Sequence, residues 1–424
     1  MTNTPAAART RKAYIVEALL EYMVSILVTG TFLSAILKQV GVSDAVIGIV
    51  SSLTSLACCA QVFSGLLVRK GRSVKKTMIL TDVINQLMFS SLYFIPFLPI
   101  GQKAKTVAFV VMILGAYLIL HVSKPEKYKW LNAFVSPSVR GSYSALKEIV
   151  SLIGGMAFTY GMSRMVDRFT ETGRAQTGFI LCGITILVLS VLNLVSLLFT
   201  GDVKSQPDAP KAAGLAESLR FLRGSAPLKR LIVVDVLFKA AVFLSTPFYG
   251  AYLIGDLGFS LTAVSLFQMV YAGVRVVFSP RMGRIADKHG NAHMLSVCFL
   301  IASASFFVNA FTCPKLRYAY LIYNIIYAVS EAGINNGINN ITYDYIPLEH
   351  FSLVMGTRNA VCGAAGFLVS LAGSAIVAAV QKNGLTLFGK PVYAPQILSF
   401  GAAVLFLIAV IYLRTFIIKM PRGK

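Results

Sequence analysis

The chain of 424 residues is poor in charged side chains, which make up 13% of it. Soluble domains contain about twice that share, so this composition argues against a soluble globular protein and excludes disordered, collagen-like and coiled-coil chains. The sequence has no CxxC pair, no Walker P-loop and no G-x-S-x-G motif, which argues against a disulfide scaffold, an ATPase and a serine hydrolase. Five cysteines lie within apolar runs and are interpreted as small core residues: Cys58, Cys59, Cys182, Cys298 and Cys362.

Apolar residues are abundant, at 56% of the chain, and the mean hydropathy is +0.72. Several uncharged apolar runs reach the roughly 20 residues that a helix needs to cross a bilayer. The pattern predicts an all-α membrane protein with twelve transmembrane helices. Their approximate ranges are 13–37, 45–68, 77–99, 105–130, 142–165, 177–200, 229–254, 260–281, 291–312, 316–342, 354–380 and 395–418.

Basic residues are unevenly distributed between the predicted loops. Most of the 39 lysines and arginines fall on the side that contains both termini, which the positive-inside rule identifies as cytoplasmic. Because they are spread among apolar runs, the net charge of +22 does not indicate nucleic-acid binding. Lys124, Lys127 and Lys129, near the end of the fourth predicted helix, are expected to snorkel to the interface. If they line a cavity instead, an anionic substrate is favoured.

The chain divides into two similar halves. A proline-containing hydrophilic linker, predicted at 201–228, separates six helices in 1–200 from six helices in 229–424. Aligning the halves pairs Asp235 with Glu17 and Lys239 with Glu21, and a slightly different register pairs Glu331 with His121. Parallel repeats of this kind are typical of transporters, whose substrate site lies between the halves near the midplane.

A loop motif strengthens this interpretation. Gly283-Arg-Ile-Ala-Asp287-Lys-His-Gly290 resembles the G-x-L-A-D-R-x-G signature of the major facilitator superfamily, and it lies between the second and third helices of its half. The equivalent segment of the first half is degenerate, and a P-x-x-R-G turn follows the fourth helix. Gly65, Arg69 and Arg72 belong to the degenerate segment, and Arg140 belongs to the P-x-x-R-G turn.

The resemblance implies alternating access, in which two bundles move around a cavity lined by the first, fourth, seventh and tenth helices. It also implies that Asp287 contacts the start of the fifth helix, near Arg140 or Lys147, and that Arg69 or Arg72 contacts Glu349. The alternative is that these loop charges only face solvent.

Four ionisable residues are predicted at similar depth within the membrane. Glu21, His121, Lys239 and Glu331 lie on the four helices just named, roughly 13 to 17 Å from their cytoplasmic ends. Charges at this depth are costly and usually functional. Glu21 or Glu331 is therefore predicted to couple solute movement to protons, and Lys239, together with Arg275, is predicted to bind substrate or to act as a switching counter-ion. Two alternatives stay open, namely an ion pair between Glu21 and Lys239 that holds the halves together or acts as a latch, and a packing role for His121.

Two polar stripes accompany these residues. Gln268, Tyr271 and Arg275 share one face of the eighth helix, and Asn335 follows Glu331 on the tenth. Arg275 has no charged counterpart in the other half, which favours a role in binding substrate or in coupling. The asparagines near Asn335 either bind a polar solute or hydrogen-bond neighbouring helices.

The sequence thus predicts a secondary transporter of a small solute, a monomer in the cytoplasmic membrane of a prokaryote, without a cofactor, a metal or enzymatic activity. Efflux of amphiphilic compounds is the first alternative, although the fifth helix lacks the G-P-x-x-G-G signature of drug/proton antiporters. A non-transporting receptor or scaffold is the second. A membrane-bound acyl or glycosyl transferase is disfavoured, because the charges converge on the middle of the membrane.

Overall fold

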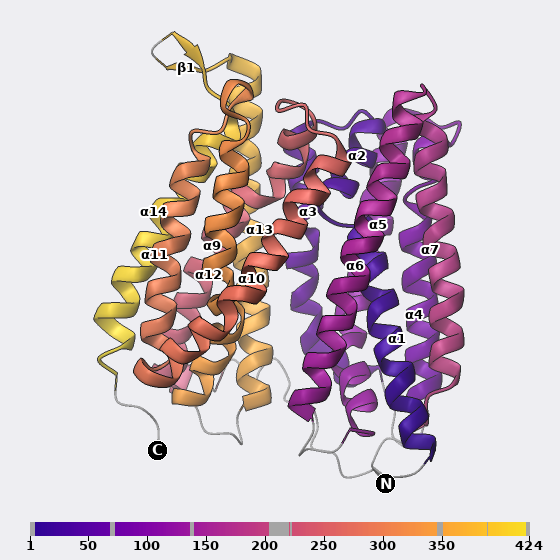
Figure 1. Ribbon diagram of the computed structural model, residues 1–424, viewed down its shortest axis with the longest axis vertical. Helices are drawn as coiled ribbons and strands as arrows, with labels where there is room; N and C mark the ends of the chain where they lie inside the picture. The colour runs from indigo at the N-terminus through magenta and orange to yellow at the C-terminus, as the bar shows by residue number, and fades with distance from the viewer. Residues whose placement is uncertain are drawn as a thin grey trace. The chain divides into compact units, whose positions relative to one another are not determined.

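A computed structural model of the chain describes residues 5–67, 73–135, 140–202, 220, 223–345, 351–387 and 389–420. These residues are almost entirely helical (Figure 1). They form two compact units. Unit 1 comprises Met1–Val42, Ala60–Ala212 and Ser260–Ser265, and unit 2 comprises Ser43–Cys59, Ala213–Phe259 and Leu266–Lys424.

Unit 1 is built from long helices of the first half. They are α1 (Pro5–Leu27), α2 (Gly30–Gln39), α4 (Val74–Ser91), α5 (Gln102–Asn132), α6 (Arg140–Glu171) and α7 (Ala175–Leu198), with short 3-10 segments at Cys58–Leu66 and Ile95–Phe97. Helices α1 and α2 meet at a bend of 42°. The Tyr93 and Tyr117 hydroxyls donate to the carbonyls of Leu27 and Val28, at 2.6 and 2.8 Å. These two bonds satisfy acceptors that the break in the helix leaves buried.

Unit 2 contains the remaining helices. They are α3 (Asp44–Ala57), α9 (Ala226–Ile254), α10 (Leu261–His289, of which Leu261–Ser265 belong to unit 1), α11 (Asn291–Asn309), α12 (Ala319–Tyr345), α13 (Phe351–Asn383) and α14 (Ala394–Tyr412). Shorter elements are the 3-10 turn Pro314–Leu316, the two-residue strands β1 (Thr386–Leu387) and β2 (Lys390–Pro391), and a π-helical turn at Leu413–Ile417.

Close packing of α3 in unit 2 depends on small residues. A Cβ on Gly48 would lie 1.9 Å from Cε1 of Phe248 on α9, and one on Gly363 of α13 would lie 2.4 Å from the carbonyl oxygen of Ser55. The Ser55 and Ser374 hydroxyls also donate between α3 and α13, to the carbonyls of Gly363 and Ala45. The backbones of these helices therefore approach more closely than larger side chains would permit.

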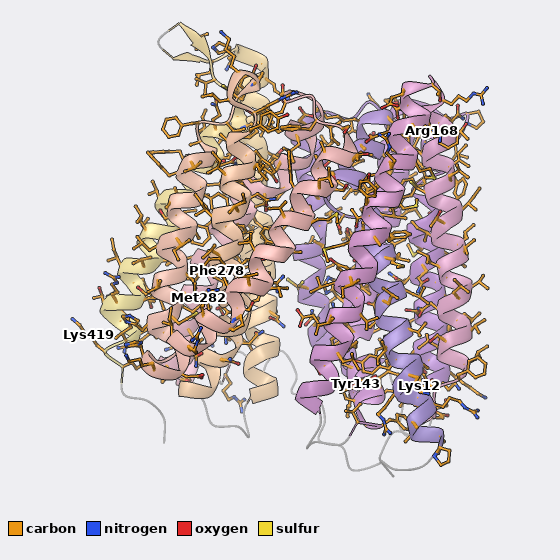
Figure 2. All side chains as sticks on the ribbon, viewed as in Figure 1. Lys12, Tyr143, Arg168, Phe278, Met282 and Lys419 are labelled. Carbon is orange, nitrogen blue, oxygen red and sulfur yellow. The ribbon has the colours of Figure 1, made fainter. Side chains whose placement is uncertain are left out.

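The distribution of polarity is that of a membrane protein. Val107 and Val111 on α5 and Val191 on α7 are about 60% exposed, whereas Asp82 and Asn193 are buried. Charged and polar ends flank the apolar middle of the helices, with Lys12 and Tyr143 at one end of unit 1 and Arg168 at the other (Figure 2). This pattern indicates that the apolar outer faces contact lipid.

Within the described ranges, nine helices are long and apolar enough to cross a membrane, or ten if α1 and α2 form one span. Each of the twelve predicted segments coincides with one or two described helices, so the all-α fold class is confirmed. The division into bundles at 1–200 and 229–424 stays a prediction. Most of the predicted linker lies outside the described residues, and the structure groups α3 with unit 2.

Candidate functional site: buried ion pairs in each unit

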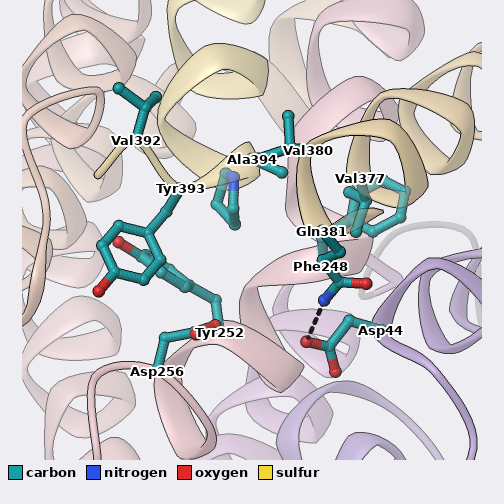
Figure 3. A pocket seen from close by; sticks show the side chains of 11 residues that line it. Asp44, Phe248, Tyr252, Asp256, Val377, Val380, Gln381, Val392, Tyr393 and Ala394 are labelled. Carbon is teal, nitrogen blue, oxygen red and sulfur yellow. Dashed lines mark hydrogen bonds between the residues drawn. The ribbon is translucent and has the colours of Figure 1, made fainter. Parts of the chain in front are cut away.

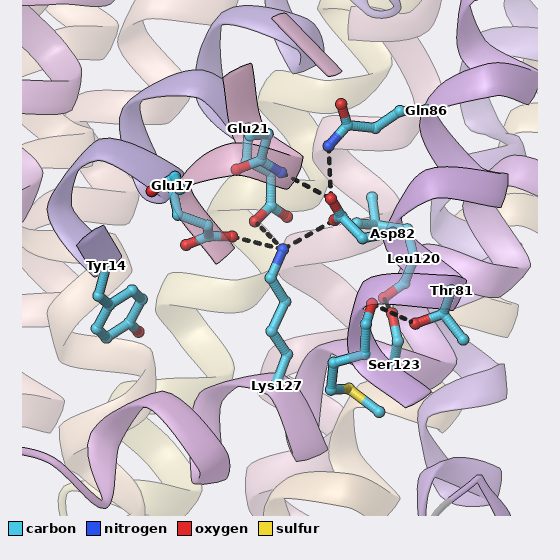
Figure 4. A network of polar contacts seen from close by, with 12 residues as sticks. Tyr14, Glu17, Glu21, Thr81, Asp82, Gln86, Leu120, Ser123 and Lys127 are labelled. Atoms are coloured by element: carbon cyan, nitrogen blue, oxygen red, sulfur yellow. Dashed lines mark hydrogen bonds and ion pairs between the residues drawn. The ribbon is translucent and has the colours of Figure 1, made fainter. Parts of the chain in front are cut away.

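The most concentrated set of buried charges lies in unit 1 around Lys127 of α5 (Figure 4). Its Nζ is 2.5 Å from Oε1 of Glu17, 3.2 Å from Oε2 of Glu21 and 2.9 Å from Oδ1 of Asp82. Lys127 is 5% exposed, Glu17 1% and Asp82 8%. We call these four residues the lysine cluster. Three carboxylates from two helices, α1 and α4, thus converge on one ammonium group.

Asp82 is the most fully hydrogen-bonded member of the lysine cluster. Besides Lys127, the amide groups of Gln86 and Asn193 donate to its Oδ2, at 2.7 and 2.6 Å. Gln86 and Asn193 are themselves buried, on α4 and α7. A carboxylate with three donors is well stabilised as an anion. Asp82 is therefore suited to hold Lys127 in place.

Glu17 and Glu21 differ in their access to solvent. They are four residues apart and lie on the same face of α1, as their spacing predicts. The Glu17 side chain is 2% exposed, whereas that of Glu21 is 29% exposed. Glu21 therefore lies on the solvent-accessible side of the lysine cluster, and Glu17 lies in its interior.

The expectation that Lys127 snorkels to the membrane interface is wrong. Lys127 lies five residues before the end of α5, and the facing carboxylates keep its ammonium group inside the unit. An ammonium buried with three acids is stabilised by charge pairing, which replaces the hydration that snorkelling would supply. Sequence reasoning also missed Asp82, although a charged residue within the predicted span 77–99 was the available signal.

His121 lies on α5, six residues before Lys127, and is 8% exposed. Its Nδ1 is 3.1 Å from Nε2 of Gln61. Gln61 belongs to the 3-10 segment Cys58–Leu66. This contact agrees with a hydrogen-bonded packing role for His121, and its predicted role in coupling stays a prediction.

In unit 2, the structure brings together three of the predicted site residues. The Tyr271 hydroxyl donates to Oε2 of Glu331, and Nη1 of Arg275 lies 4.0 Å from the same oxygen. The Arg275 and Glu331 side chains are 31% and 20% exposed. The ring of Tyr327 lies 6.3 Å from that of Tyr271. Helices α10 and α12 thus bring a partly accessible carboxylate, guanidinium and hydroxyl group close together.

A second ion pair in unit 2 joins Asp235 of α9 to Arg358 of α13. Nε of Arg358 donates to Oδ2 of Asp235, and Nη2 donates to Oδ1 at 2.7 Å and to the Ile338 carbonyl at 2.9 Å. Both residues are buried, at 5% and 2% exposure. Arg358 falls within the predicted span 354–380, but it was not identified as a candidate site residue from the sequence.

Lys239 lies one helical turn after Asp235 and is half-buried. Its Nζ is 5.5 Å from the centre of the Phe238 ring and 5.7 Å from that of Phe243. It lines a small pocket with Asn339, Asn359 and the Asp235–Arg358 pair. Its predicted pairing with Glu21 is not tested, because the two residues belong to different units.

The remaining predicted residues are placed individually. Gln268 and Asn335 are exposed, and the Asn335 carbonyl accepts a bond from the Asn339 amide at 3.1 Å. Gly283 and Asp287 line a pocket with Ser279, Asn291 and Asn340. Gly290 has a φ of 89° and is the N-cap of α11, a backbone conformation that favours glycine.

Part of the predicted loop contacts cannot be followed in the structure. Arg69, Arg72 and Glu349 lie outside the described residues, as does the side chain of Arg140, whose backbone begins α6. Gly65 falls within the 3-10 segment Cys58–Leu66. The proposed contacts of Asp287 with the start of α6 and of Arg69 or Arg72 with Glu349 stay predictions.

Another pocket in unit 2 lies where α9, α13 and α14 meet α3 (Figure 3). The Gln381 amide donates to Oδ2 of Asp44 at 3.0 Å, and Asp256 lies on the same wall as Tyr252 and Tyr393. Among its described lining residues there are acids but no lysine or arginine. None of the predicted site residues lies in this pocket.

The long apolar helices and their exposed apolar faces define a multi-pass membrane protein. Residues 231–423 match the family model of the Major Facilitator Superfamily. This match and the fold of the whole chain support the resemblance to that superfamily that the loop motif indicates. The match in sequence is carried by the second half. No curated protein sequence matches the chain significantly.

Solved structures of several transporters share the fold over nearly the full length. A point mutant of the nucleoside transporter NupG superposes with a TM-score of 0.73 at 13% identity, covering 96% of this chain and 100% of that one. A D-xylose-proton symporter gives 0.72 at 12% identity, covering 96% and 97%. A bacterial homologue of the iron transporter ferroportin, in an inward-facing state, gives 0.69 at 14% identity, covering 98% and 99%. At these identities the likeness concerns the fold.

Proposed function

We propose that this protein is a secondary transporter that moves a small solute by alternating access, coupled to protons through the lysine cluster. It acts as a monomer in the cytoplasmic membrane of a prokaryote, with both termini in the cytoplasm. The observation that carries the proposal is the convergence of Glu17, Glu21 and Asp82 on the single ammonium of Lys127. The similarity of fold to a D-xylose-proton symporter supports the same class of function.

The charge balance of the lysine cluster favours a bound proton. Three ionised carboxylates contact one ammonium in a site where three members are less than a tenth exposed, and the ammonium groups of Lys124 and Lys147 lie nearby. Uncompensated charge is costly in such surroundings, and one proton on the Glu17–Glu21 pair reduces the negative charge in contact with the ammonium. Asp82 is the least suited to take that proton, because three donors already stabilise its ionised form.

Exchange of the proton follows from the geometry of Glu17 and Glu21. Both compete for Lys127, and only Glu21 is substantially exposed. A proton that reaches Glu21 weakens its attraction for Lys127 and leaves the ammonium to Glu17 and Asp82. Loss of the proton restores the pair between Glu21 and Lys127. A carboxylate that alternates between a cation and a proton in this way can link protonation to a change of conformation.

On the solute side, Glu331, Arg275 and Tyr271 supply a partly exposed acid, base and hydroxyl on α10 and α12. The guanidinium lies 4.0 Å from the Glu331 carboxylate, at the outer limit of an ion pair, so it can turn to a polar solute at little cost. Glu331 also stays a candidate for coupling, as its position on the tenth helix predicts.

The proposal is tested in proteoliposomes that contain a pH-sensitive dye and are supplied with sugars, organic acids, amino acids, nucleosides or amphiphilic drugs. Solute-dependent proton movement is expected in the wild type, because solute and proton share one conformational cycle. We expect this movement to be lost in Glu17→Gln and Glu21→Gln. Glu171→Gln, which changes an exposed acid at the end of α6, should behave as the wild type.

Counterflow of the same solute separates coupling from transport. A variant defective only in coupling retains exchange of labelled for unlabelled solute while losing proton movement. Wild-type proton movement in both Glu17→Gln and Glu21→Gln would remove the lysine cluster from the mechanism. Absence of transport for every solute class would favour a receptor or scaffold, and transport restricted to amphiphilic drugs would favour efflux.

A further inference from the structure

We propose that unit 2 contains an anion-binding site centred on Lys239, and that the transported solute is a small organic anion with a carboxylate group. This inference rests on the proposed transport function and names the class of its substrate. It begins from the distribution of charge around Lys239 and from the pocket that Lys239 lines.

Lys239 shares its nearest acid along α9, Asp235, with Arg358. Asp235, one turn earlier on α9, is the nearest acid along the helix, but both of its carboxylate oxygens accept from Arg358. Among the described side chains of unit 2, no carboxylate lies within 4.0 Å of the Lys239 ammonium, and its nearest aromatic partners are Phe238 and Phe243. The pairing of Asp235 with Arg358 therefore leaves the charge of Lys239 only partly compensated.

A partly compensated ammonium on a membrane-spanning helix is costly, and such groups usually serve to bind ions or substrates. The rings of Phe238 and Phe243, at 5.5 and 5.7 Å, give the ammonium only a weak interaction. A carboxylate that enters the pocket supplies the missing charge. It also accepts hydrogen bonds from an ammonium, which has three donors.

The pocket has the polarity and the size for the carboxylate group of a small anion. Asn339 and Asn359 line it beside Lys239, and Phe238 and Ile338 provide apolar walls. Its volume is about 40 Å³, which is room for a group of a few water-sized atoms, such as one carboxylate, so the rest of the solute lies outside it. The buried Arg358 guanidinium adds positive potential to one wall while its donors remain bound to Asp235 and Ile338. A compact carboxylate fits this environment better than a sugar or a nucleoside.

The Arg275–Glu331 pair does not cancel this charge. Arg275 and Glu331 offset one another across 4.0 Å, with Tyr271 bound to the same carboxylate. Unit 1 shows the opposite imbalance, since three acids surround Lys127. The geometry thus assigns the proton to unit 1 and the anion to unit 2, and each ligand reduces the charge imbalance of its unit.

A competing role for Lys239 is an ion pair with Glu21 that acts as a latch between the halves. Glu21 already has a cation in its own unit, at 3.2 Å from Lys127. The two roles differ in what they require. In a binding site, the positive charge of Lys239 is required for the anion to bind, whether or not Glu21 is ionised. In a latch, the positive charge of Lys239 is required only while Glu21 is ionised.

The test measures thermal stability of the purified full-length protein with acetate, lactate, benzoate, succinate or inorganic phosphate at constant ionic strength. The neutral amides lactamide and benzamide serve as matched probes. A ligand that binds the folded state raises the melting temperature. We expect at least one carboxylate to stabilise the protein and its amide to have no effect, with an apparent Kd at least about tenfold weaker in Lys239→Gln.

Two further variants control for charge and folding. Lys239→Arg keeps the cation and should retain most of the binding, which shows that a loss in Lys239→Gln does not arise from misfolding. Lys382→Gln removes an exposed lysine at the end of α13 and should bind as the wild type does. Equal stabilisation by a carboxylate and its amide, or an unchanged Kd in Lys239→Gln, would overturn the site.

Transport assays separate this inference from the proposed function. Proton-coupled transport of neutral solutes alone would overturn the anion site and leave the proposed function standing. Anion binding that depends on Lys239 without any proton movement would support the site and contradict proton coupling. If Glu21→Gln restores transport and binding to Lys239→Gln, the latch is correct and the anion site is wrong.

Discussion

At the scale of single residues, Lys127 is the group whose removal has the clearest consequence. Its ammonium lies within 3.2 Å of three carboxylates and is 5% exposed. Lys127→Met leaves these acids without a cation, and removing one partner of a buried ion pair costs about 3–5 kcal/mol. We therefore expect Lys127→Met to melt at a much lower temperature than the wild type. In acidic buffer the difference between the two proteins should be smaller, because protonation of the acids reduces the negative charge that Lys127 would otherwise offset.

The control for this prediction lies two residues further along the same helix. Lys129 is exposed, and surface charges contribute little to stability, so Lys129→Met should melt close to the wild type. Equal effects of the two substitutions would show that the lysine cluster contributes no more than a surface lysine. A double variant, Lys127→Met with Glu17→Gln, is expected to recover part of the loss, since one buried acid is removed with the cation.

The residues of the candidate site were predictable to different degrees. Spacing and repeat symmetry identified Glu21, Lys239 and Glu331 as candidates from the sequence alone, whereas Glu17 was noted as the counterpart of Asp235 but not as a candidate. Lys127 was misplaced, because a lysine near a helix end is equally compatible with snorkelling and with burial. What decides between them is whether acids on other helices face it, and the sequence does not give the rotation of one helix against another. The same information was missing for Arg358.

At the scale of helices, most elements follow from the apolar runs, while their packing depends on close contacts that hydropathy does not report. Helix α3 begins at Asp44, near its predicted start at residue 45, yet it packs against α9 and α13 in unit 2. Small residues such as Gly48 and Gly363 mark these contacts. They are visible in the sequence, but the partner of each small residue is not.

Gly48 provides a test of this packing. A Cβ at this position would lie 1.9 Å from the Phe248 ring, so Gly48→Ala forces α3 and α9 apart, and overpacking of this kind costs about 1–3 kcal/mol. We expect a lower melting temperature, with part of it recovered by Phe248→Leu. Gly101→Ala, at a position where an added Cβ meets nothing within 4 Å, should have little effect. Equal melting of the two alanine variants would contradict the close contact.

At the scale of the whole molecule, the repeat in the sequence predicted equivalent positions but not equivalent partners. Glu17 and Asp235 occupy matching places on α1 and α9, and each is buried against a cation of its own unit. The cation comes from α5 in unit 1 and from α13 in unit 2. Because of this difference, carboxylates outnumber ammonium groups in the lysine cluster of unit 1, whereas cations outnumber carboxylates around Asp235 in unit 2. This asymmetry arises from the side-chain partners and not from the fold.

That asymmetry predicts how transport depends on the membrane potential. One proton bound by the lysine cluster and one monovalent carboxylate bound at Lys239 carry no net charge together, and movement of a neutral pair across the membrane is indifferent to voltage. Uptake of the binding monocarboxylate should follow an imposed pH gradient and should not change when valinomycin and potassium set the potential. In Lys239→Gln, uptake is expected to fall under both conditions. Uptake driven by potential alone would show that net charge moves, and that the paired proton and anion do not describe the cycle.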